Sequence, residues 1–401
     1  GKKAVVLMTG DDHGNGGTVG RFNQYKTMSP AGCSVEDWEC VRGTSYIYPN
    51  TPISNAQAAA FTADGFEVGL HVNTNCANYT PTSLQNFYTQ QLSAWSTRFP
   101  SVPASPSQRH HCGVWSDWAT ASKVELSQGI RLDTNYYFWP PNWVGNRPGF
   151  FTGSGMPMRF ADLNGTLIDV YQATTQITDE SGQTYPFTVN TLLDRALGAE
   201  GYYGVFTVNA HTDSNTSSVS DAVVTSAQAR GVPIVSARQM LNWLDGRNNS
   251  SFSSLVWNNN TLSFAIAPGT GTRGLQAMLP VRSAVGTVAS ITLNGSPVSY
   301  TTQQIKGIEY ALFSATTGNY VATYTNATTD TTPPSVSSTS PSNGEPNAGI
   351  GSSVTATFSE TVDPATINAN TFVLKDSTNA IVPATVTYNA ATRTATLQPS
   401  S

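Results

Sequence analysis

Residues 4–14 read Ala4-Val5-Val6-Leu7-Met8-Thr9-Gly10-Asp11-Asp12-His13-Gly14, an apolar run followed at once by charged and polar side chains. The apolar run predicts a buried strand. In a sheet of parallel strands, the residues just past the carboxyl end of a strand face the mouth in which active sites form. Two adjacent carboxylates there repel each other unless a cation neutralises them. We therefore expect a metal bound by one carboxylate, with the other free as a base. A solvated Asp-Asp turn is the alternative for the pair taken alone.

Up to Arg247, short apolar runs alternate with segments of helical periodicity. This alternation indicates βαβ units with a parallel sheet, either a barrel or a doubly wound sheet. An Asn164-Gly165 turn within residues 158–171 predicts a β-hairpin inserted into the pattern. The expected strands are Ala4–Met8, Phe66–Leu70, Ile130–Leu132, Val205–Val208 and Val232–Val235, and the expected helices are Ser54–Asp64, Ser83–Phe99, Ala119–Gln128, Ser218–Arg230 and Ser236–Asp245.

After Arg247 the helical periodicity stops. Residues 255–324 contain period-two runs separated by Gly, Asn and Pro turns, which predict a small β-sandwich. A Thr/Pro-rich linker leads from there to a last β-rich stretch. We therefore divide the chain into an α/β domain over residues 1–247, a β-sandwich over 248–327 and a further β domain over 328–401.

The composition is that of a folded extracellular protein whose surface is polar but uncharged. Only 11% of the 401 residues are charged, and the formal net charge is -5. The chain therefore has no basic patch for nucleic acid. No apolar run approaches the ~20 residues that a membrane span needs. The first residues already resemble a strand rather than a signal peptide, so we expect a mature or trimmed piece of a longer protein.

Four cysteines are present, an even number without a Cys-x-x-Cys pair. In a chain of this composition they predict disulfides rather than metal ligands. Proximity in the sequence favours Cys33 with Cys40 and Cys76 with Cys112, and the second bond would tie together two loops near the expected site. Four cysteines allow three pairings, and free buried thiols are the alternative.

Further polar clusters fall at the ends of successive expected strands. His71 ends the second strand and Asn75 follows it, and an imidazole near a carboxylate begins many zinc sites. Arg109 lies in a third cluster, where its permanent charge would orient a carboxylate and lower the pKa of that group. Asp133 and His211 end two later strands. Each of these residues alone is more often structural, but their shared position favours one site.

In order and chemistry, these clusters resemble the motifs of the polysaccharide deacetylases, which are carbohydrate esterases with a distorted (β/α) barrel fold. Residues 9–13 are similar to the first motif, Thr-Phe-Asp-Asp-Gly, and His71 with Asn75 is similar to the second, in which two histidines stand four residues apart. Arg109 and Gly113 match the third, Asp133 with Trp139 the fourth, and residues 208–211 the fifth. The resemblance covers roughly residues 1–245. Residues 328–401 resemble a bacterial Ig-like domain that lacks its last strands.

The resemblance implies a role for each residue. Asp12, His71 and Asn75 would bind a divalent metal, with zinc as the expected ion, and Asp11 would be the general base. His211 would be the general acid, Arg109 would hold Asp11, and Asp133 would tune His211. Asn75 stands where the family has a second histidine. Because an amide is a weaker ligand than an imidazole, His111 or His13 is the alternative third ligand.

The resemblance implies a secreted, bacterial hydrolase that removes N- or O-acetyl groups from an extracellular polysaccharide, with the β domains as a means of attachment to a cell surface or matrix. A carbohydrate-binding or adhesion protein that retains only the fold is the alternative. Aromatic residues near the site predict sugar stacking, with core packing as the alternative for about half of them. They are Trp115, Trp118, Tyr136, Tyr137, Trp139 and Trp143.

Overall fold

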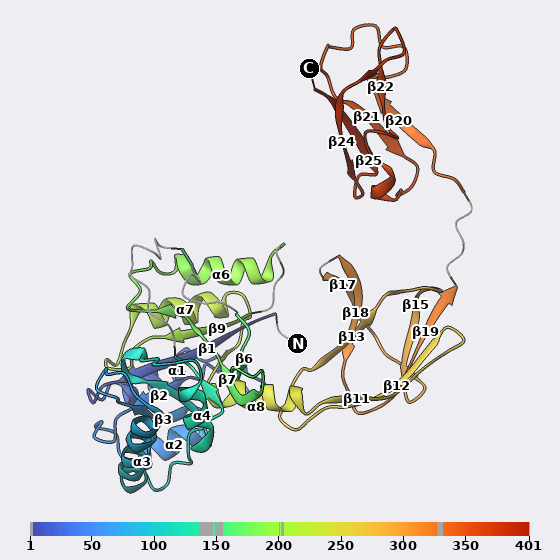
Figure 1. The fold of residues 1–401 in the computed structure, drawn as a ribbon. Helices are drawn as coiled ribbons and strands as arrows, with labels where there is room; N and C mark the ends of the chain where they lie inside the picture. The colour runs from blue at the N-terminus through green and yellow to red at the C-terminus, as the bar shows by residue number, and fades with distance from the viewer. Residues whose placement is uncertain are drawn as a thin grey trace. The chain divides into compact units, whose positions relative to one another are not determined.

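The computed structural model describes residues 3–135, 147–148, 155–199, 201, 204–305, 307–326 and 332–400. Figure 1 shows helices and strands alternating in the first part of the chain and mostly strands in the rest. The contacts divide the chain into two compact units. One consists of residues 1–282 and 288–324, and the other of residues 283–287 and 325–401. The two units are described separately.

The first part is a distorted (β/α) barrel, as predicted. Its strands form one sheet in the order β6-β7-β5-β4-β3-β2-β1-β9-β8, with β10 also paired to β1. All of these pairings are parallel except that of β6 with β7. The strands are β1 (Ala4–Asp12), β2 (Thr44–Ile47), β3 (Glu67–Val72), β4 (Ser107–His110), β5 (Leu132–Asp133), β6 (Met158–Ala161), β7 (Leu167–Gln172), β8 (Thr175–Thr178), β9 (Gly204–Asn209) and β10 (Ile234–Val235).

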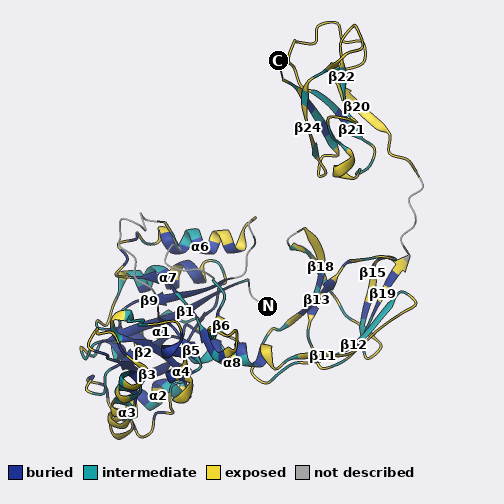
Figure 2. Ribbon diagram, in the orientation of Figure 1, coloured by how far each residue is buried: buried dark blue, intermediate teal, exposed yellow. Residues whose placement is uncertain are grey.

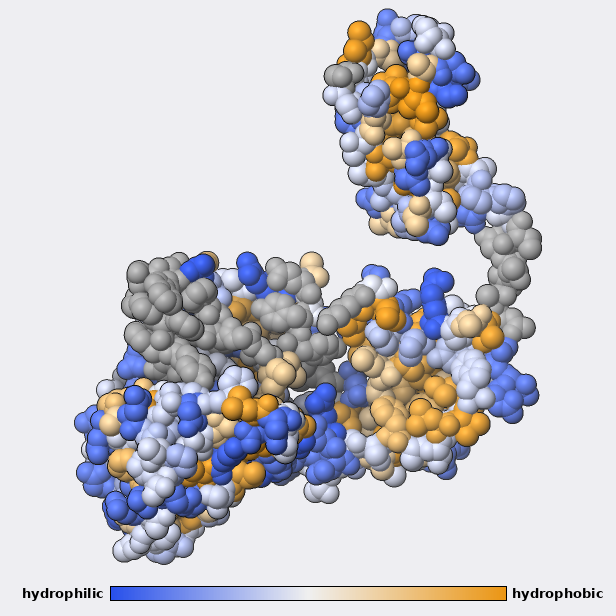
Figure 3. Space-filling view, viewed as in Figure 1, coloured by the Kyte–Doolittle hydropathy of each residue, from blue (hydrophilic) through white to orange (hydrophobic). Residues whose placement is uncertain are grey.

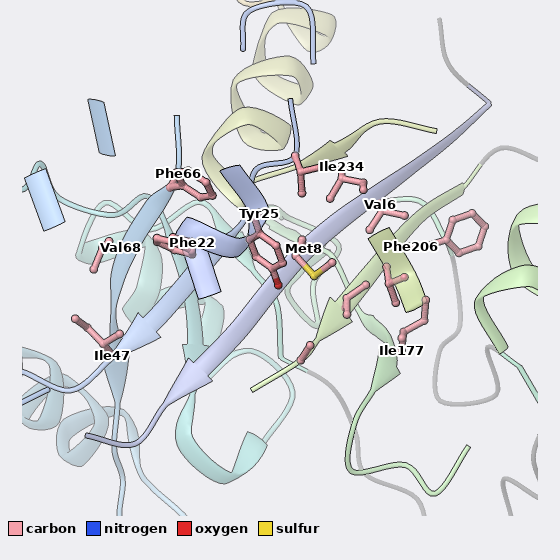
Figure 4. Close-up of a cluster of buried hydrophobic side chains, with 14 of the residues drawn as sticks. Val6, Met8, Phe22, Tyr25, Ile47, Phe66, Val68, Ile177, Phe206 and Ile234 are labelled. Carbon is pink, nitrogen blue, oxygen red and sulfur yellow. The ribbon is translucent and has the colours of Figure 1, made fainter. Parts of the chain in front are cut away.

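Strand β1 pairs with three strands of this sheet, β2, β9 and β10, and contributes to the core. All nine of its residues are buried, as expected of a strand in a parallel sheet that is covered on both faces. Val6 and Met8 pack into a cluster with Phe22, Phe66 and Phe206 (Figure 4). The apolar run at the start of the chain therefore forms the strand around which the site is built.

Hydroxyl side chains begin several helices of the barrel. Ser54, Thr80 and Ser236 each accept a hydrogen bond from the backbone three residues later, in capping boxes, which satisfy amides that have no partner within the helix. The helices are α1 (Thr18–Met28), α2 (Asn55–Ala63), α3 (Pro81–Arg98), α4 (Thr120–Ser127), α6 (Phe187–Leu197), α7 (Ser218–Gln228) and α8 (Ala237–Asn248), with a short 3-10 turn, η1 (His111–Gly113).

Five helices and strands of the barrel were not predicted from the sequence: α1, β2, β4, β8 and α6. Strand β2 reads Thr-Ser-Tyr-Ile and lacks an apolar run, although all four residues are buried. Helix α1 buries Arg21 along with Phe22 and Tyr25, so its inner face is not purely apolar. The predicted hairpin forms as β6 and β7, but it is part of the barrel sheet, because β7 pairs with β5.

Residues 251–326 form two antiparallel sheets, as predicted for a β-sandwich. One has the order β11-β12-β19-β15-β14 with β16 beside β15, and the other has the order β13-β18-β17. Figure 3 shows exposed hydrophobic residues over this part of the chain. The strands are β11 (Ser251–Asn258), β12 (Thr261–Ala267), β13 (Gln276–Pro280), β14 (Arg282–Ser283), β15 (Gly286–Leu293), β16 (Ser296–Pro297), β17 (Thr301–Ile305), β18 (Ile308–Ser314) and β19 (Gly318–Asn326).

The last part of the chain is a small antiparallel β domain. Its larger sheet has the order β20-β21-β25-β24, and β22 pairs with β23. Few of its residues are buried, whereas the barrel strands are buried almost throughout (Figure 2). The elements are β20 (Val336–Ser340), β21 (Val354–Phe358), η2 (Pro364–Thr366), β22 (Leu374–Lys375), β23 (Ile381–Val382), β24 (Ala384–Asn389) and β25 (Thr394–Pro399).

Both predicted disulfides are present, Cys33–Cys40 and Cys76–Cys112. The second joins the loop after β3 to η1, which follows β4. Among the helices of the described residues, none has the length and apolar character to cross a membrane.

Candidate metal centre

Four histidines gather where neighbouring strands of the barrel end. His13 follows β1, His71 lies in β3, His111 follows β4, and His211 lies two residues after β9. Because β4, β3, β2, β1 and β9 are neighbours in the sheet, the carboxyl ends of these parallel strands bring residues far apart in the sequence to one rim.

Three of these histidines are close enough together to share one metal ion. The ring centroids are 4.9 Å apart for His13 and His111, 5.3 Å for His71 and His111, and 5.4 Å for His13 and His71. One ring nitrogen of each lies within 4.8 Å of those of the other two. Three imidazole nitrogens are a common ligand set for zinc, which leaves a fourth position open for water.

Hydrogen bonds at one ring nitrogen leave the other nitrogen of His71 and of His13 available. His71 Nδ1 lies 2.9 Å from the carbonyl oxygen of Arg109, and His71 Nε2 is buried without a partner. His13 Nδ1 lies 2.9 Å from Asp213 Oδ2, and the backbone N–H of His13 donates to Asp213 Oδ1 at 2.7 Å. Bonds of this kind select the tautomer and orient metal-binding histidines.

His111 completes the set from η1, where the chain turns sharply. The next residue, Cys112, has a φ of 63° and is bonded to Cys76. His111 Nδ1 is buried and has no hydrogen-bond partner among the described residues. His71 Nε2 and His111 Nδ1 are both buried without a hydrogen-bond partner in the described part of the chain. Their lone pairs are therefore suited to coordinate a metal ion.

Two of the three histidines, His71 and His111, are held in the neutral form that binds metals. Burial lowers the pKa of His71 to about 4, against the opposing charge of Asp11. Burial and the neighbouring His13 also lower the pKa of His111. Because a metal ligand must be deprotonated, little proton release opposes binding at these two residues.

Asp11 lies beside the three histidines as an ionised carboxylate. Its Oδ1 is 4.0 Å from His71 Nδ1, and its Oδ2 is 3.9 Å from Arg109 Nη1 and accepts a hydrogen bond from Asn209 Nδ2 at 3.1 Å. Burial favours the neutral acid, but the charges of Arg109 and the surrounding histidines outweigh it and lower the pKa of Asp11. Asp11 Oδ1 is buried without a hydrogen bond and is therefore available as a proton acceptor.

His211 lies across from Asp11 and is held by Asp179. Its Nδ1 is 2.7 Å from Asp179 Oδ1, and its ring stacks on His13 at 5.4 Å. Burial disfavours the charged imidazolium, but the hydrogen bond to Asp179 and the charges of Asp11, Asp179 and Glu180 outweigh it and raise the pKa of His211 to about 9. A protonated imidazole at neutral pH is suited to donate a proton.

Asp12, predicted as a metal ligand, has a different position. It follows Asp11 in β1, and successive side chains of a strand point to opposite faces. Its Oδ1 accepts from the backbone N–H groups of residues 14, 15 and 16, and its Oδ2 accepts from the backbone and hydroxyl of Thr18. Asp12 therefore holds the turn that leads into α1 and presents His13 to the site. It is in none of the candidate metal groups of the described residues.

Asp133, predicted to tune His211, lies in a separate buried cluster. Its carboxylate accepts hydrogen bonds from the backbone and side chain of Asn135 at 2.7 and 2.9 Å. Burial raises the pKa of Asp133 and that of its neighbour Glu125. Asn135 in turn accepts from the backbone N–H of His110 at 2.8 Å. The residue beside His211 is instead Asp179.

The remaining predicted residues differ in their exposure and their contacts. Asn75 is exposed, in a loop with a φ of 58°. Trp118 is 62% exposed, whereas Trp115 stacks on Phe160 at 5.4 Å. Tyr136, Tyr137, Trp139 and Trp143 lie outside the described residues.

Sequence reasoning missed four residues of the site, namely Tyr48, Asp179, Glu180 and Asp213. Asp179 and Glu180 directly follow β8, which is the same signal that identified the other residues. Tyr48 follows the unpredicted strand β2. Burial and the charges of Asp11 and Asp213 raise the pKa of Tyr48 to about 12.

Comparison with known proteins gives separate results for the parts of the chain. A family model described as a bacterial Ig-like domain matches residues 330–401, which confirms that prediction. The sequence matches no curated protein. The chain is similar to a solved polysaccharide deacetylase from Bacillus cereus, with a TM-score of 0.34 and 12% identity over 58% of this chain and 91% of that one. It is also similar to a family 4 carbohydrate esterase from Bacillus subtilis, with a TM-score of 0.34 and 10% identity over 60% of this chain and 81% of that one.

Proposed function

We propose that this protein is a metal-dependent hydrolase that removes acetyl groups from an extracellular polysaccharide. The observation that carries the proposal is the convergence of His13, His71 and His111 beside an ionised Asp11 and a protonated His211. A metal centre, a base and an acid on one rim are the groups that hydrolysis of an amide or ester requires.

We assign the metal to His13, His71 and His111, with zinc as the ion. Three nitrogen ligands suit zinc better than the hard ions magnesium and calcium, which prefer oxygen. The bonds from His71 to the Arg109 carbonyl and from His13 to Asp213 support this assignment, because they direct the free nitrogen of each ring. Zinc in such a site would lower the pKa of a bound water towards neutrality.

Asp11 would take the proton from the attacking water. Its unpartnered Oδ1 is the acceptor atom, and Arg109 keeps the carboxylate ionised and in place. Arg109 is itself held by hydrogen bonds from Nη2 to Thr9 Oγ1, the Thr134 carbonyl and Thr175 Oγ1, at 2.8 to 2.9 Å. A rigid base within reach of the water contributes ~10²- to 10⁴-fold to such reactions.

His211 would donate a proton to the departing amine or alcohol. Asp179 fixes Nδ1, so Nε2 is the donating nitrogen. The short contact between Asp179 and His211 keeps the ring charged until the proton is transferred, and the site is left with a neutral imidazole that can accept a proton in the next cycle.

The substrate class follows from the chemistry together with the composition of the chain. The Ig-like domain and the two disulfides support a location outside a bacterial cell, where acetylated polysaccharides are available. The β domains would then attach the enzyme to a surface or matrix. N-acetyl and O-acetyl groups are both within reach of this chemistry.

The test is acetate release from a panel of N- and O-acetylated polysaccharides, with and without a chelator. We expect release that stops on chelation, returns with added zinc, and falls at least 100-fold in Asp11→Asn. Asp194→Asn is a matched control, because Asp194 is a surface residue paired with Arg230. Glycan binding by the folded, zinc-loaded protein without acetate release would contradict the proposal and favour a carbohydrate-binding protein.

A further inference from the structure

Tyr48 lies in the row of metal-binding histidines, although it was not part of the predicted site. Asp12 is level with Ile47 in the pairing of β1 with β2, and Ile47 is level with Leu70 in the pairing of β2 with β3. Tyr48, His13 and His71 are each the next residue along the chain after one of these paired residues. Residues level with each other in neighbouring parallel strands project in the same direction.

The ring of Tyr48 contacts all three histidines of the proposed metal site. The centroid distances are 5.5 Å to His71 and 5.9 Å to both His13 and His111. The side chain is half-buried, so the ring borders the site while one edge stays accessible. These contacts place the ring of Tyr48 beside the three imidazoles that would hold the metal.

The hydroxyl of Tyr48 has no hydrogen-bond partner in the part of the chain that the structure describes. Three fully buried tyrosines of the barrel do have one. These tyrosine hydroxyls form hydrogen bonds of 2.8 to 2.9 Å, Tyr25 with Ser220, Tyr46 with Ser107 and Tyr88 with His110. Tyr48 is only half-buried, at the border of the site, so its hydroxyl is available to a ligand that binds there.

We propose that the Tyr48 hydroxyl donates a hydrogen bond to the carbonyl oxygen of the acetyl group during its hydrolysis. This proposal rests on the proposed function. As water adds to the carbonyl carbon, the C=O π electrons move to oxygen, and the negative charge on that oxygen strengthens the bond from Tyr48. The charge returns to the carbonyl when the bond to the amine or alcohol breaks and His211 supplies the proton. Tyr48 keeps its own proton throughout.

The alternative is that Tyr48 only packs against the imidazoles. Tyr48→Phe separates the two roles, because phenylalanine keeps the ring and removes the hydroxyl. If the hydroxyl binds the oxyanion, we expect kcat to fall about 100-fold with KM nearly unchanged, the usual result of removing one such donor. Zinc affinity, measured by isothermal titration calorimetry, should remain that of the wild type.

A second measurement does not depend on catalysis. Acetate carries the same oxygen and should bind the zinc-loaded protein, and we expect its affinity to fall about tenfold in Tyr48→Phe, the loss typical of one hydrogen bond. Tyr300→Phe is the matched control, since it removes a tyrosine hydroxyl that bonds the Val288 carbonyl in the β-sandwich, and it should change neither quantity.

The outcomes separate this proposal from the proposed function. The wild type could release no acetate from any substrate and yet bind acetate more tightly than Tyr48→Phe does. In that case the proposed hydrolysis is wrong, but the proposed hydrogen bond from Tyr48 to the ligand is supported. If kcat and acetate affinity are both unchanged in Tyr48→Phe, or if the zinc-loaded wild type does not bind acetate, the proposal for Tyr48 is overturned.

Discussion

At the scale of single residues, the consecutive side chains of Asp11, Asp12 and His13 have three separate tasks. Asp11 lies beside Arg109, Asp12 caps the turn into α1, and His13 faces two other histidines. The alternation of side chains along a strand separates the first two. The turn held by Asp12 then directs His13 back to the face of Asp11. In the proposed mechanism, one short segment would therefore supply a base, a structural cap and a metal ligand.

The first prediction distinguishes His13 from Asp12 as the metal ligand. We expect His13→Ala to weaken zinc affinity at least 100-fold while the fold is retained. Asp12→Asn should keep zinc binding but lower the free energy of unfolding by about 1–3 kcal/mol, because it replaces an acceptor of several N–H groups. Calorimetric zinc titration and urea unfolding measure the two quantities. Loss of zinc binding in Asp12→Asn without loss of stability would return Asp12 to the metal site.

The second prediction concerns the pH dependence of the reaction. The pKa of His211 is about 9 in the folded protein, and the ordinary histidine value is ~6.5. The acid form is therefore present up to about pH 9, and we expect kcat/KM to fall above that pH. In Asp179→Asn the charge that holds the imidazolium is lost, so this alkaline limit should move to lower pH. A pH–rate profile measures the shift.

The same group contributes to stability with a definite sign. Because folding raises the pKa of His211, its contribution is fully present below the unfolded pKa of ~6.5 and is lost as the pH rises through about 9. Asp179→Asn should therefore be less stable than the wild type at pH 6 and should approach it above pH 9. An alkaline limit and a stability difference that do not depend on Asp179 would contradict the assignment of His211.

At the scale of elements, the disulfide Cys76–Cys112 joins the loop after β3 to the turn that carries His111. The two segments each hold residues with positive φ, including Asn75, Cys76 and Cys112. The covalent bond limits the positions that these turns can take. It would therefore help to fix the direction of His111, the proposed third metal ligand, which does not lie in a regular strand or α-helix.

The third prediction compares the two disulfides. We expect the double variant Cys76→Ser/Cys112→Ser to bind zinc about tenfold or more weakly, because His111 becomes mobile. The matched variant Cys33→Ser/Cys40→Ser removes a bond that closes a short loop outside the site and should leave zinc affinity unchanged, although both variants lose some stability. Equal zinc affinities in the two variants would show that η1 positions His111 without the disulfide.

Elements were predictable where apolar runs or periodic patterns marked them. The run at residues 4–8 predicted β1, and Asn164-Gly165 predicted the hairpin of β6 and β7. Strand β2 was missed because its buried side chains are mostly hydroxyl-bearing and satisfied by hydrogen bonds, as between Ser45 and Thr212. Helix α1 was missed because buried Arg21 binds the carbonyl of Ser214. Tertiary partners decide both cases, and a single sequence does not contain them.

The site was predictable at the level of strand ends. This rule identified Asp11, His71, Arg109 and His211, which the fold brings together. It did not give the direction of a side chain, so Asp12 was expected at the metal. Nor did it give the order of the strands. Strand β8, which precedes Asp179, is the neighbour of β9, whereas β5 with Asp133 is separated from β9 by four strands.

At the scale of the whole molecule, the chain consists of two compact units, and the proposed metal site belongs to one of them. The Ig-like unit has a small core that includes Ala356, Ala395 and Leu397. Each unit buries its own apolar residues, so the unfolding of one need not require the unfolding of the other.

The fourth prediction is that the whole chain unfolds in two calorimetric transitions. Zinc at 100 times its Kd should stabilise the larger unit by about 2.7 kcal/mol and leave the transition of the Ig-like unit unchanged. His13→Ala should abolish the shift. A single transition, or one in which zinc raises both midpoints equally, would show that the units unfold together.

The central position of β1 has a consequence for the time course of synthesis. Ala4 pairs with Gly204, and Leu7 pairs with Val235, so β1 meets two of its neighbours only after some two hundred further residues have been synthesised. At ~5–20 residues per second this delay is about 10–40 s. During that interval an apolar strand with free edges is exposed to other chains, and a chaperone or translocation factor that shelters the nascent segment would govern the yield of active protein.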